Sequence, residues 1–376
     1  MSPRVTILLS DTGGGHRAVA AAVRSELLAL HPGLRVELVD GLLRYAPHPL
    51  NRLPDWYASI IAHGKGLWRH GYALSDGRRR VRVLNHAARP YVRAAVRRLL
   101  QAHPAEVMVS THPLLVGPVL DGLGERGPGF VTVVTDLISA HAWWFDCRAA
   151  RTLVPTHAAR TRALAFGLAP ERVRVCGLPV ARAFRRGLRD KFAARRKLGW
   201  KVGQFTVLLL GGAEGMAPLQ AIAGTLRASA MPMQLAVVCG RNAGLREQLT
   251  ALDSQFPTYV YGFVENMAEL MIASDVVVTK AGPSTVMEAL NCGRPLLLSG
   301  AIPGQEEGNV RMVVEGGVGW WTPRPEQVLG RLRALRVSGR RELETAAAAA
   351  RKLVTPGAAR AVATEIIALL PEPVIT

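Results

Sequence analysis

The chain has 376 residues, of which 49% are hydrophobic and 20% charged, so it is long and apolar enough for two folded domains. No apolar run reaches the roughly 18 residues that a membrane-spanning helix needs, and Asp11 interrupts the first run too early for a secretory signal. The formal net charge is +19. Length and apolar content exclude a disordered chain and a transmembrane one, and four widely scattered cysteines do not suggest a disulfide scaffold.

The positive charge is carried by the first half of the chain. Residues 1–185 hold 25 Lys and Arg against 12 Asp and Glu, and residues 186–201 hold 7 against 1. Residues 202–376 hold 15 of each. This asymmetry favours a polyanionic partner for the first half, either nucleic acid or an anionic membrane surface. An Arg-rich composition alone would not explain the neutral second half.

Short apolar runs alternate with helix-sized segments along both halves. A strand is predicted at 4–10, a helix at 15–30 and a second strand at 34–40. Further strands are predicted at 106–111, 130–135, 151–155, 172–177, 205–211, 234–240, 258–263, 275–280 and 294–300, and helices at 338–370. Strands that are apolar on both faces and alternate with helices indicate parallel sheets.

We therefore predict an α/β fold with two Rossmann-like domains facing a cleft, at residues 1–185 and 202–376, joined by a basic linker at 186–201. Ligands are expected beyond the carboxyl ends of the strands.

The stretch "SDTGGGHRAVAAAV", residues 10–23, joins the first strand to the first helix and is typical of an anion-binding turn. Gly13, Gly15 and Ala18 fit a dinucleotide fingerprint, and Asp40 ends the second strand where a ribose-binding acid belongs. A dehydrogenase is therefore one alternative. His16 argues against it, because dinucleotide sites keep small residues in the first turn of this helix.

The second half has phosphate-type loops of its own, which the substrate domain of a dehydrogenase does not need. Gly211, Gly212 and Gly215 follow one strand, and "KAGPSTVMEAL" follows another. Gly282, Ser284 and Thr285 would offer donors to a diphosphate at a helix N-terminus. Each loop taken alone could be only a structural turn.

The segments "SDTGGGHRAVAAAV", "VVTDLISAHAWWF", "GLPV", "LLLGGAEGM", "TKAGPSTVMEAL" and "IPGQEEGN" run in this order from residue 10 to about 310. Together they resemble the monogalactosyldiacylglycerol synthases and related bacterial diacylglycerol glycosyltransferases of the MurG-like glycosyltransferase family 28. The resemblance implies a GT-B fold and a UDP-hexose donor in the C-terminal domain. It also implies inversion at the anomeric carbon with no metal or other cofactor.

The resemblance assigns a role to each matching residue. His16 matches the general base. Phe263 and Val264 match the uracil contacts, and Glu288 matches the ribose contact. The diphosphate-side residues are Gly211, Gly212, Gly215, Gly282, Ser284 and Thr285; the hexose contacts are Gln305 and Glu306; the acceptor-side residues are Gly13, Gly14, Gly15, Asp136, His141 and Trp144.

The expected reaction transfers a hexose, galactose before glucose, from a UDP-sugar to the sn-3 hydroxyl of 1,2-diacylglycerol. An enzyme of the lipid II type, acting on an undecaprenyl-linked acceptor, is the next alternative. Residues 41–103 hold 12 Lys and Arg with only Asp55 and Asp76 as acids, interleaved with Trp56, Tyr57, Ile60, Ile61, Leu67 and Trp68. This pattern favours a peripheral, monotopic attachment to the cytoplasmic face of an anionic membrane. No nucleic-acid module is recognisable, so we expect no nucleic-acid partner.

Overall fold

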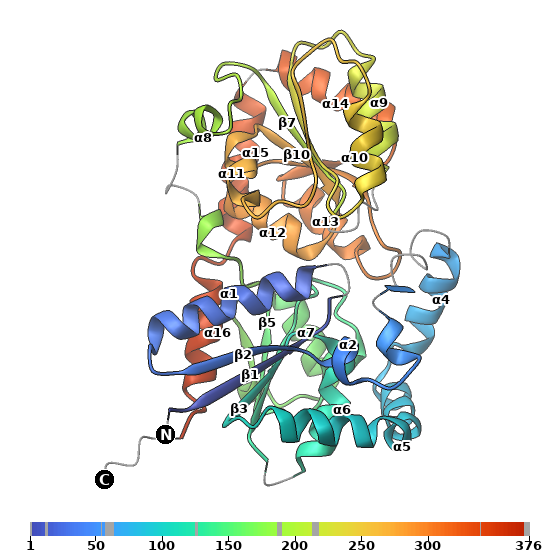
Figure 1. The fold of residues 1–376 in the computed structure, drawn as a ribbon, viewed down its shortest axis with the longest axis vertical. Helices are drawn as coiled ribbons and strands as arrows, with labels where there is room; N and C mark the ends of the chain where they lie inside the picture. The colour runs from blue at the N-terminus through green and yellow to red at the C-terminus, as the bar shows by residue number, and fades with distance from the viewer. Residues whose placement is uncertain are drawn as a thin grey trace. The chain divides into compact units, whose positions relative to one another are not determined.

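The computed structural model of the chain describes residues 2–11, 14–53, 55–56, 64–124, 127–185, 190–212, 218–338 and 340–371. The chain folds into two compact units (Figure 1). The first unit comprises Met1–Ala181, Pro303–Gln305 and Thr355–Thr376. The second comprises Arg182–Ile302 and Glu306–Val354.

The first unit is built on a six-stranded parallel sheet with the order β2-β1-β3-β4-β5-β6. Its strands are β1 (Arg4–Leu9), β2 (Arg35–Asp40), β3 (Val107–Ser110), β4 (Gly129–Val133), β5 (Arg151–Val154) and β6 (Val173–Val175). In register, Leu9 lies opposite Asp40 of β2, and Leu8 lies opposite Ser110 of β3. The strand order therefore reverses between β1 and β3, which makes the carboxyl ends of these two strands the switch point of the sheet.

Helices cover both faces of this sheet. They are α1 (Gly15–Leu30), α2 (Gly41–Tyr45), α4 (Lys65–Ser75), α5 (Arg78–Ala102), α6 (Pro113–Leu123), α7 (His157–Ala165) and α16 (Ala358–Ile367), with 3-10 turns η1 (Leu50–Arg52), η2 (Ala142–Trp144) and η3 (Pro170–Arg172). Right-handed crossovers place α1 on one face and α5, α6 and α7 on the other. A buried cluster that includes Leu8, Met108 and Phe130 fills the space beneath α5 and α6.

The second unit repeats this plan with a parallel sheet of order β12-β11-β10-β7-β8-β9. Its elements are η4 (Arg182–Phe184), α8 (Lys191–Lys197), β7 (Thr206–Leu210), α9 (Leu219–Arg227), β8 (Gln234–Val238), α10 (Ala243–Thr250), β9 (Thr258–Tyr261), α11 (Met267–Ala273), β10 (Val276–Lys280), α12 (Pro283–Asn291), β11 (Leu296–Gly300), α13 (Glu307–Glu315), β12 (Gly319–Trp321), α14 (Pro325–Val337) and α15 (Arg340–Leu353). The order reverses between β7 and β10, so the switch point lies at their carboxyl ends. Every predicted strand is present, while the short strand β12 was not predicted.

The basic segment at 186–201 is not a linker where the structure describes it. Residues 191–197 form α8, whose first turn is capped by the Asp190 carboxylate. Arg195 is 2% exposed, and its guanidinium donates to Asp275 at 2.7 Å and to three main-chain carbonyls. This segment is therefore an integral part of the second unit, and its charges are used in packing.

The end of the chain also departs from the predicted domain bounds. Residues 340–353 and 358–367 are helical as expected. The last helix, α16, does not belong to the second unit, because it packs against α1 of the first (Figure 1). Its buried face, with Val362 and Ile366 at 1% and 0% exposure, explains why an Ala-rich helix is held there.

Candidate active site

The loop after β1 places a histidine at the switch point of the first sheet. Gly14 is the N-cap of α1 with φ 81°, a left-handed conformation that favours glycine. The helix begins at Gly15, so His16 stands in its first turn. Gly13 lies outside the described residues. The predicted position of His16 in the first turn of the helix after the first strand is confirmed.

The His16 side chain is fixed by the loops that follow β3 and β4. Its Nδ1 lies 2.7 Å from the Thr111 carbonyl oxygen and 3.1 Å from the Thr135 hydroxyl oxygen. A carbonyl oxygen can only accept, so Nδ1 carries the proton and donates it to Thr111. In the neutral ring the lone pair then lies on Nε2. No described residue forms a hydrogen bond with Nε2, so this nitrogen can accept a proton from a substrate.

The surroundings of His16 keep it neutral. Burial lowers its pKa to about 4, although the Thr111 carbonyl and the Asp11 carboxylate act in the opposite direction. The positive end of the α1 dipole also disfavours a second proton. The ring of His112 packs edge-on at 4.7 Å, and burial lowers the pKa of His112 well below its usual value. At neutral pH His16 is therefore an unprotonated base.

Trp144 and Asp136, both predicted on the acceptor side, lie in the buried region next to His16. Trp144 is fully buried in the core, and its Nε1 donates to the Asp136 carboxylate at 2.7 Å. The Trp144 ring centroid lies 6.1 Å from that of His16. Asp136 is only 7% exposed. This geometry favours a supporting role for both residues over direct contact with an acceptor.

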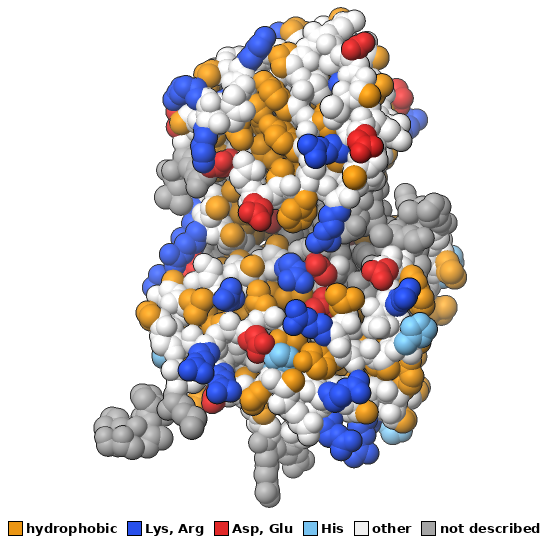
Figure 2. Space-filling view, viewed as in Figure 1, with side chains coloured by type: hydrophobic (Ala, Val, Ile, Leu, Met, Phe, Trp, Pro, Cys, Tyr) orange, Lys and Arg blue, Asp and Glu red, His pale blue; other side chains and the backbone are white. Residues whose placement is uncertain are grey.

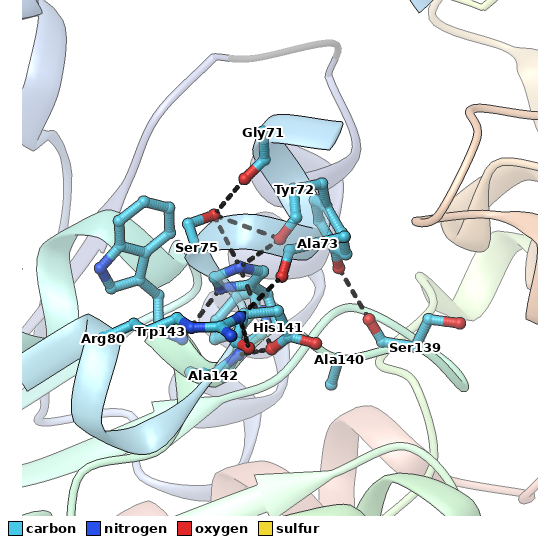
Figure 3. A network of polar contacts seen from close by, with 12 residues as sticks. Gly71, Tyr72, Ala73, Ser75, Arg80, Ser139, Ala140, His141, Ala142 and Trp143 are labelled. Atoms are coloured by element: carbon cyan, nitrogen blue, oxygen red, sulfur yellow. Dashed lines mark hydrogen bonds and ion pairs between the residues drawn. The ribbon is translucent and has the colours of Figure 1, made fainter. Parts of the chain in front are cut away.

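His141, the third of this group, ties the loop after β4 to helix α4 (Figure 3). Its Nε2 lies 3.3 Å from the Tyr72 carbonyl and 3.2 Å from the Ser75 hydroxyl, while Nδ1 accepts from the Trp143 N–H at 3.2 Å. The Asp76 carboxylate accepts from the N–H of the next residue in the loop, Ala142, at 3.0 Å. His141 is 3% exposed, so it holds α4 in place rather than facing solvent.

The structure argues against a dinucleotide site on the first sheet. Asp40 is 6% exposed, and both of its carboxylate oxygens are engaged. One oxygen accepts from the Leu43 N–H at 2.8 Å, as the N-cap of α2, and the other from the Asp11 N–H at 3.1 Å. A carboxylate held in this way is not available for a ribose diol, because its hydrogen-bonding capacity serves the fold.

In the second unit, the predicted diphosphate residues gather at the switch point between β7 and β10. Gly211 and Gly212 follow β7 directly, and Gly212 has φ 74°. Gly282 is the N-cap of α12 and supplies no side-chain cap. Ser284 and Thr285 follow in the first turn of this helix. Gly215 lies outside the described residues. The N-terminal end of α12 is therefore suited to binding an anion, as predicted from the sequence.

A lysine that sequence reasoning missed lies between these glycines. A Cβ atom on Gly282 would come within 2.9 Å of Lys280 Nζ, and one on Gly212 would lie 3.9 Å from Lys280 Cε. Lys280 is the last residue of β10. The signal was present in "TKAGPS", since a lysine at the carboxyl end of a strand lies next to the glycine turn and helix N-terminus at which an anion is expected.

Glu306 holds this lysine in place. Its Oε1 lies 2.5 Å from Lys280 Nζ, and its Oε2 accepts from the Ile302 N–H at 2.9 Å. Glu306 is 2% exposed. The prediction gave Glu306 a direct contact with the hexose; its engagement and burial instead favour positioning of Lys280. Gln305 immediately precedes Glu306 and is half-buried.

Glu288 is a half-buried carboxyl group one turn after Ser284 on α12. Burial raises its pKa to about 8. No described residue forms a hydrogen bond or ion pair with its carboxyl group. A buried carboxyl group without a partner loses the solvation of its charged form, which hydroxyl donors of a ligand would restore.

Phe263 and Val264 follow the carboxyl end of β9, which is the last strand of the second sheet on the side of β7 and β8. The Phe263 side chain is 61% exposed, and the Arg241 guanidinium lies over its ring at 5.5 Å. An exposed aromatic ring beside a guanidinium is suited to stacking against a flat base.

The surface carries the charge pattern predicted from the sequence. In Figure 2 Lys and Arg side chains outnumber Asp and Glu on the face of the first unit and mix with them on the second. Exposed apolar side chains on the first unit include Leu43, Trp56, Leu67, Leu74, Val83, Leu84 and Tyr91. Tyr57, Ile60 and Ile61 lie outside the described residues. Within the described residues, no helix combines the length and the apolar character needed to cross a bilayer.

Comparisons with known proteins place the chain in a family. Residues 16–180 match the family model of monogalactosyldiacylglycerol (MGDG) synthase, and residues 206–314 match that of the glycosyltransferase family 28 C-terminal domain. The chain is 37% identical over 338 residues to the chloroplastic monogalactosyldiacylglycerol synthase of Spinacia oleracea, covering 86% of this chain and 64% of that protein. With monogalactosyldiacylglycerol synthase 2 of Arabidopsis thaliana it shares 36% identity over 369 residues, which cover 94% of this chain and 78% of the relative.

The chain thus spans slightly less than two thirds of the spinach protein and a larger part of the second relative. Among solved structures, MurG of Acinetobacter baumannii superposes with a TM-score of 0.60 at 15% identity, covering 97% of this chain and 99% of that one. This likeness confirms the predicted GT-B class of fold. On these matches, the chain belongs to the monogalactosyldiacylglycerol synthase family.

Proposed function

We propose that this protein is an inverting glycosyltransferase that moves a hexose from a UDP-sugar to the sn-3 hydroxyl of 1,2-diacylglycerol. Galactose is the favoured sugar and glucose the alternative. Family membership supports the reaction class. The observation that carries the proposal is the state of His16, which is neutral, donates from Nδ1 to Thr111 and has the lone pair of Nε2 without a partner among the described residues.

The proposed chemical step is a single displacement. The acceptor oxygen attacks C1 of the hexose while His16 Nε2 takes the hydroxyl proton, and the bond between C1 and the diphosphate oxygen breaks. The new glycosidic bond forms on the opposite face from the leaving group, giving a β-linked product from an α-linked donor. UDP leaves with the electron pair of the broken bond, and the proton stays on His16 until solvent removes it.

The leaving diphosphate gains negative charge as this bond breaks, so the donor site must supply compensating positive charge. The first turn of α12 offers main-chain donors and the positive end of a helix dipole. Lys280 adds a full positive charge, held in place by Glu306. These groups support a mechanism in which the chain's own residues stabilise UDP without a resident metal.

The rest of the donor is recognised by the residues around this turn. Glu288, which has no described partner, would accept hydrogen bonds from the ribose hydroxyls. Phe263 and Val264 would contact the uracil, with Phe263 stacking on the base. Gln305 remains the proposed hexose contact of the "GQEE" segment.

The acceptor cannot leave a bilayer, so we propose peripheral attachment at the cytoplasmic face of an anionic membrane through the first unit. Leu67 and Leu74 stand seven residues apart on α4, and so on the same face of this helix. Their exposed fractions are 78% and 69%. Arginines on the neighbouring helix α5 would add about 1 kcal/mol each near an anionic leaflet.

The test is to incubate the purified protein with diacylglycerol in anionic-lipid micelles, separately with UDP-galactose and UDP-glucose. The glycolipid is then identified by mass and sugar analysis, with His16→Ala as the inactive control. A β-hexosyl diacylglycerol that is absent with the variant supports the proposal and names the donor. UDP binding without product from either donor would contradict the diacylglycerol acceptor and favour an undecaprenyl-linked one.

A further inference from the structure

Helix α4 binds the loop that follows β4 through its last turn and its C-terminal cap (Figure 3). The Tyr72 hydroxyl donates to the Ser139 carbonyl at 2.7 Å, and His141 donates from Nε2 to the Tyr72 carbonyl at 3.3 Å. Asp76, the cap, accepts from the Ala142 N–H at 3.0 Å. We call these three contacts the α4 latch.

The latch also determines where α4 lies, because this helix has little apolar burial of its own. Among the side chains of α4 that the structure describes, none is buried, and Leu67 and Leu74 are largely exposed. A helix of 11 residues is only marginally stable in isolation. The polar contacts of the latch, with the Tyr72 ring packed edge-on at 4.7 Å from the His141 ring, therefore supply much of what holds α4 to the unit.

The latched segment leads directly into a turn that lies beside the base. His141 is the N-cap of η2, and its Nδ1 accepts from the Trp143 N–H at 3.2 Å. Trp144 is the last residue of this turn, and its ring centroid lies 6.1 Å from that of His16. The contacts that fix His141 thus also fix the turn that places Trp144.

The two ends of the loop are joined to each other next to His16. Trp144 donates to the Asp136 carboxylate at 2.7 Å, and the residue before Asp136 is Thr135, whose hydroxyl oxygen lies 3.1 Å from His16 Nδ1. Burial is the largest of the effects that act on the pKa of His16. A shift of this loop would therefore change both a hydrogen-bond partner of the base and its exposure to water.

We propose that Tyr72 and Asp76 are positioning residues for His16, and that they act through the loop that follows β4. Among the described contacts, both side chains bond to this loop and neither reaches His16. Their effect on the base is therefore exerted by holding Trp144 and Thr135 against it. The inference rests on the proposed function of His16 as general base.

The experiment compares two double variants that each remove one hydroxyl hydrogen bond and one ion pair from the first unit. Y72F/D76A opens the latch. Y91F/D121A is the control, because the Tyr91 hydroxyl also donates to a main-chain carbonyl. Asp121 is matched to Asp76, since both are paired with an arginine and their side chains are 22% and 21% exposed.

The first readout is the titration of His16, followed by NMR in protein labelled with ¹⁵N in its histidines. The His16 signals are identified by their loss in His16→Ala. Opening the latch admits water to the ring, so the pKa of His16 should rise from about 4 to above about 5, while the control leaves it unchanged. Loss of the Asp76 charge would by itself lower this pKa, so a rise reports on exposure. Asp11 and His112, the titratable groups near the ring, are present in every variant.

The second readout is the transferase assay. Y72F/D76A should lower kcat about tenfold and change the KM for the UDP-sugar less than about twofold, because the base is displaced and the donor site is intact. The acid limb of its pH profile should move to higher pH together with the NMR titration.

A His16 pKa that is equal in Y72F/D76A and the wild type, that rises equally in the control, or that is already near 6.5 in the wild type would overturn the inference, whatever the loss of thermal stability. If circular dichroism shows that Y72F/D76A does not fold, Tyr72→Phe alone decides, with a smaller rise in the same direction expected. The titration needs no substrate, so it is read even if the wild type forms no glycolipid. A raised pKa with unchanged kcat would contradict His16 as the base, and so the proposed function.

Discussion

His16 and Thr111 lie 95 residues apart in the chain, yet the histidine Nδ1 donates to the threonine carbonyl oxygen over 2.7 Å. The contact exists because β1 and β3 are neighbours in the sheet and their carboxyl ends meet at its switch point. A main-chain acceptor fixes the tautomer more firmly than a side chain would, because the carbonyl cannot donate. The substrate-facing nitrogen is thus set by the topology of the sheet.

Replacing His16 by alanine is expected to lower turnover at least about 100-fold while leaving UDP affinity unchanged, because only the general base is lost. The measurement is steady-state glycolipid formation beside UDP binding by calorimetry. His157→Ala is the matched control, since His157 is an exposed histidine of the same unit in the first turn of another helix, α7. Unchanged turnover in His16→Ala would exclude His16 as the base.

The low pKa of His16, about 4, predicts an acid limb of kcat/KM well below the usual histidine value of about 6.5.

A second pH effect concerns stability. Burial lowers the pKa of His16, His112 and His141, so between about 6.5 and the folded values the unfolded chain binds more protons than the folded one. The free energy of unfolding of the first unit should therefore fall as the pH decreases below about 6.5.

Both effects are measurable on the wild-type protein. Urea unfolding followed at about pH 7 and about pH 5 should show a lower midpoint at the acidic pH. A pH profile of kcat/KM whose acid limb titrates near 6.5 would mean that the catalytic group is a solvated histidine rather than the buried His16.

A site residue can be predicted from the sequence when its position depends on its own chain segment. It cannot be predicted when its role depends on a contact with a distant segment. The strands and the glycine turns follow from local patterns, and His16 follows from its place after "GGG". The engagement of Asp40 could not be predicted, because its partner Asp11 comes from another strand end. The sequence placed Trp144 on the acceptor side and could not decide between that role and core packing, because the buried cluster that it joins is built from distant strands and helices.

Charge was the least predictable property. Arg195 belongs to a basic run that reads as a linker, but its guanidinium satisfies carbonyl groups that only the folded second unit brings together. The α16 helix carries no signal of the unit that it joins, since an amphipathic helix fits any complementary apolar surface.

Lys280→Ala is expected to lower turnover about 10- to 100-fold, because the leaving diphosphate loses its nearest proposed cation. Glu306→Gln should lower it less, and the double variant should be no worse than Lys280→Ala, because Glu306 acts through the lysine. Turnover and UDP affinity are measured for each variant.

Lys197→Ala is the control for this cycle. Lys197 forms an ion pair of the same 2.5 Å length with Glu269, but it lies on α8 and not at the carboxyl ends of the strands. Additive losses from Lys280→Ala and Glu306→Gln would show that Glu306 has a separate role, such as the hexose contact inferred from family resemblance.

Glu288→Gln tests the partnerless carboxyl group of α12. Its raised pKa, about 8, means that the folded state holds a proton that the unfolded state releases above about 4.5. The free energy of unfolding of the wild type therefore falls as the pH rises from about 4.5 to about 8. The variant has no carboxylate charge to bury, so it should be more stable than the wild type at about pH 8. Its UDP affinity should fall several-fold if the ribose hydroxyls bind there. Glu265→Gln, at an exposed acid of the same unit, should change neither property.

Leu67→Glu and Leu74→Glu test the proposed membrane surface. Each places a charge where the proposal expects an apolar side chain to enter the lipid interface, so binding to anionic vesicles should weaken about tenfold or more in the double variant. Folding should be unaffected, because the two side chains are 78% and 69% exposed.

Val337→Glu is the control, since Val337 is 89% exposed on the second unit. If the Val337 variant weakens vesicle binding as much as the double variant, attachment does not depend on α4. Activity on diacylglycerol in detergent micelles separates the two roles: it should be retained by the double variant if α4 serves attachment alone.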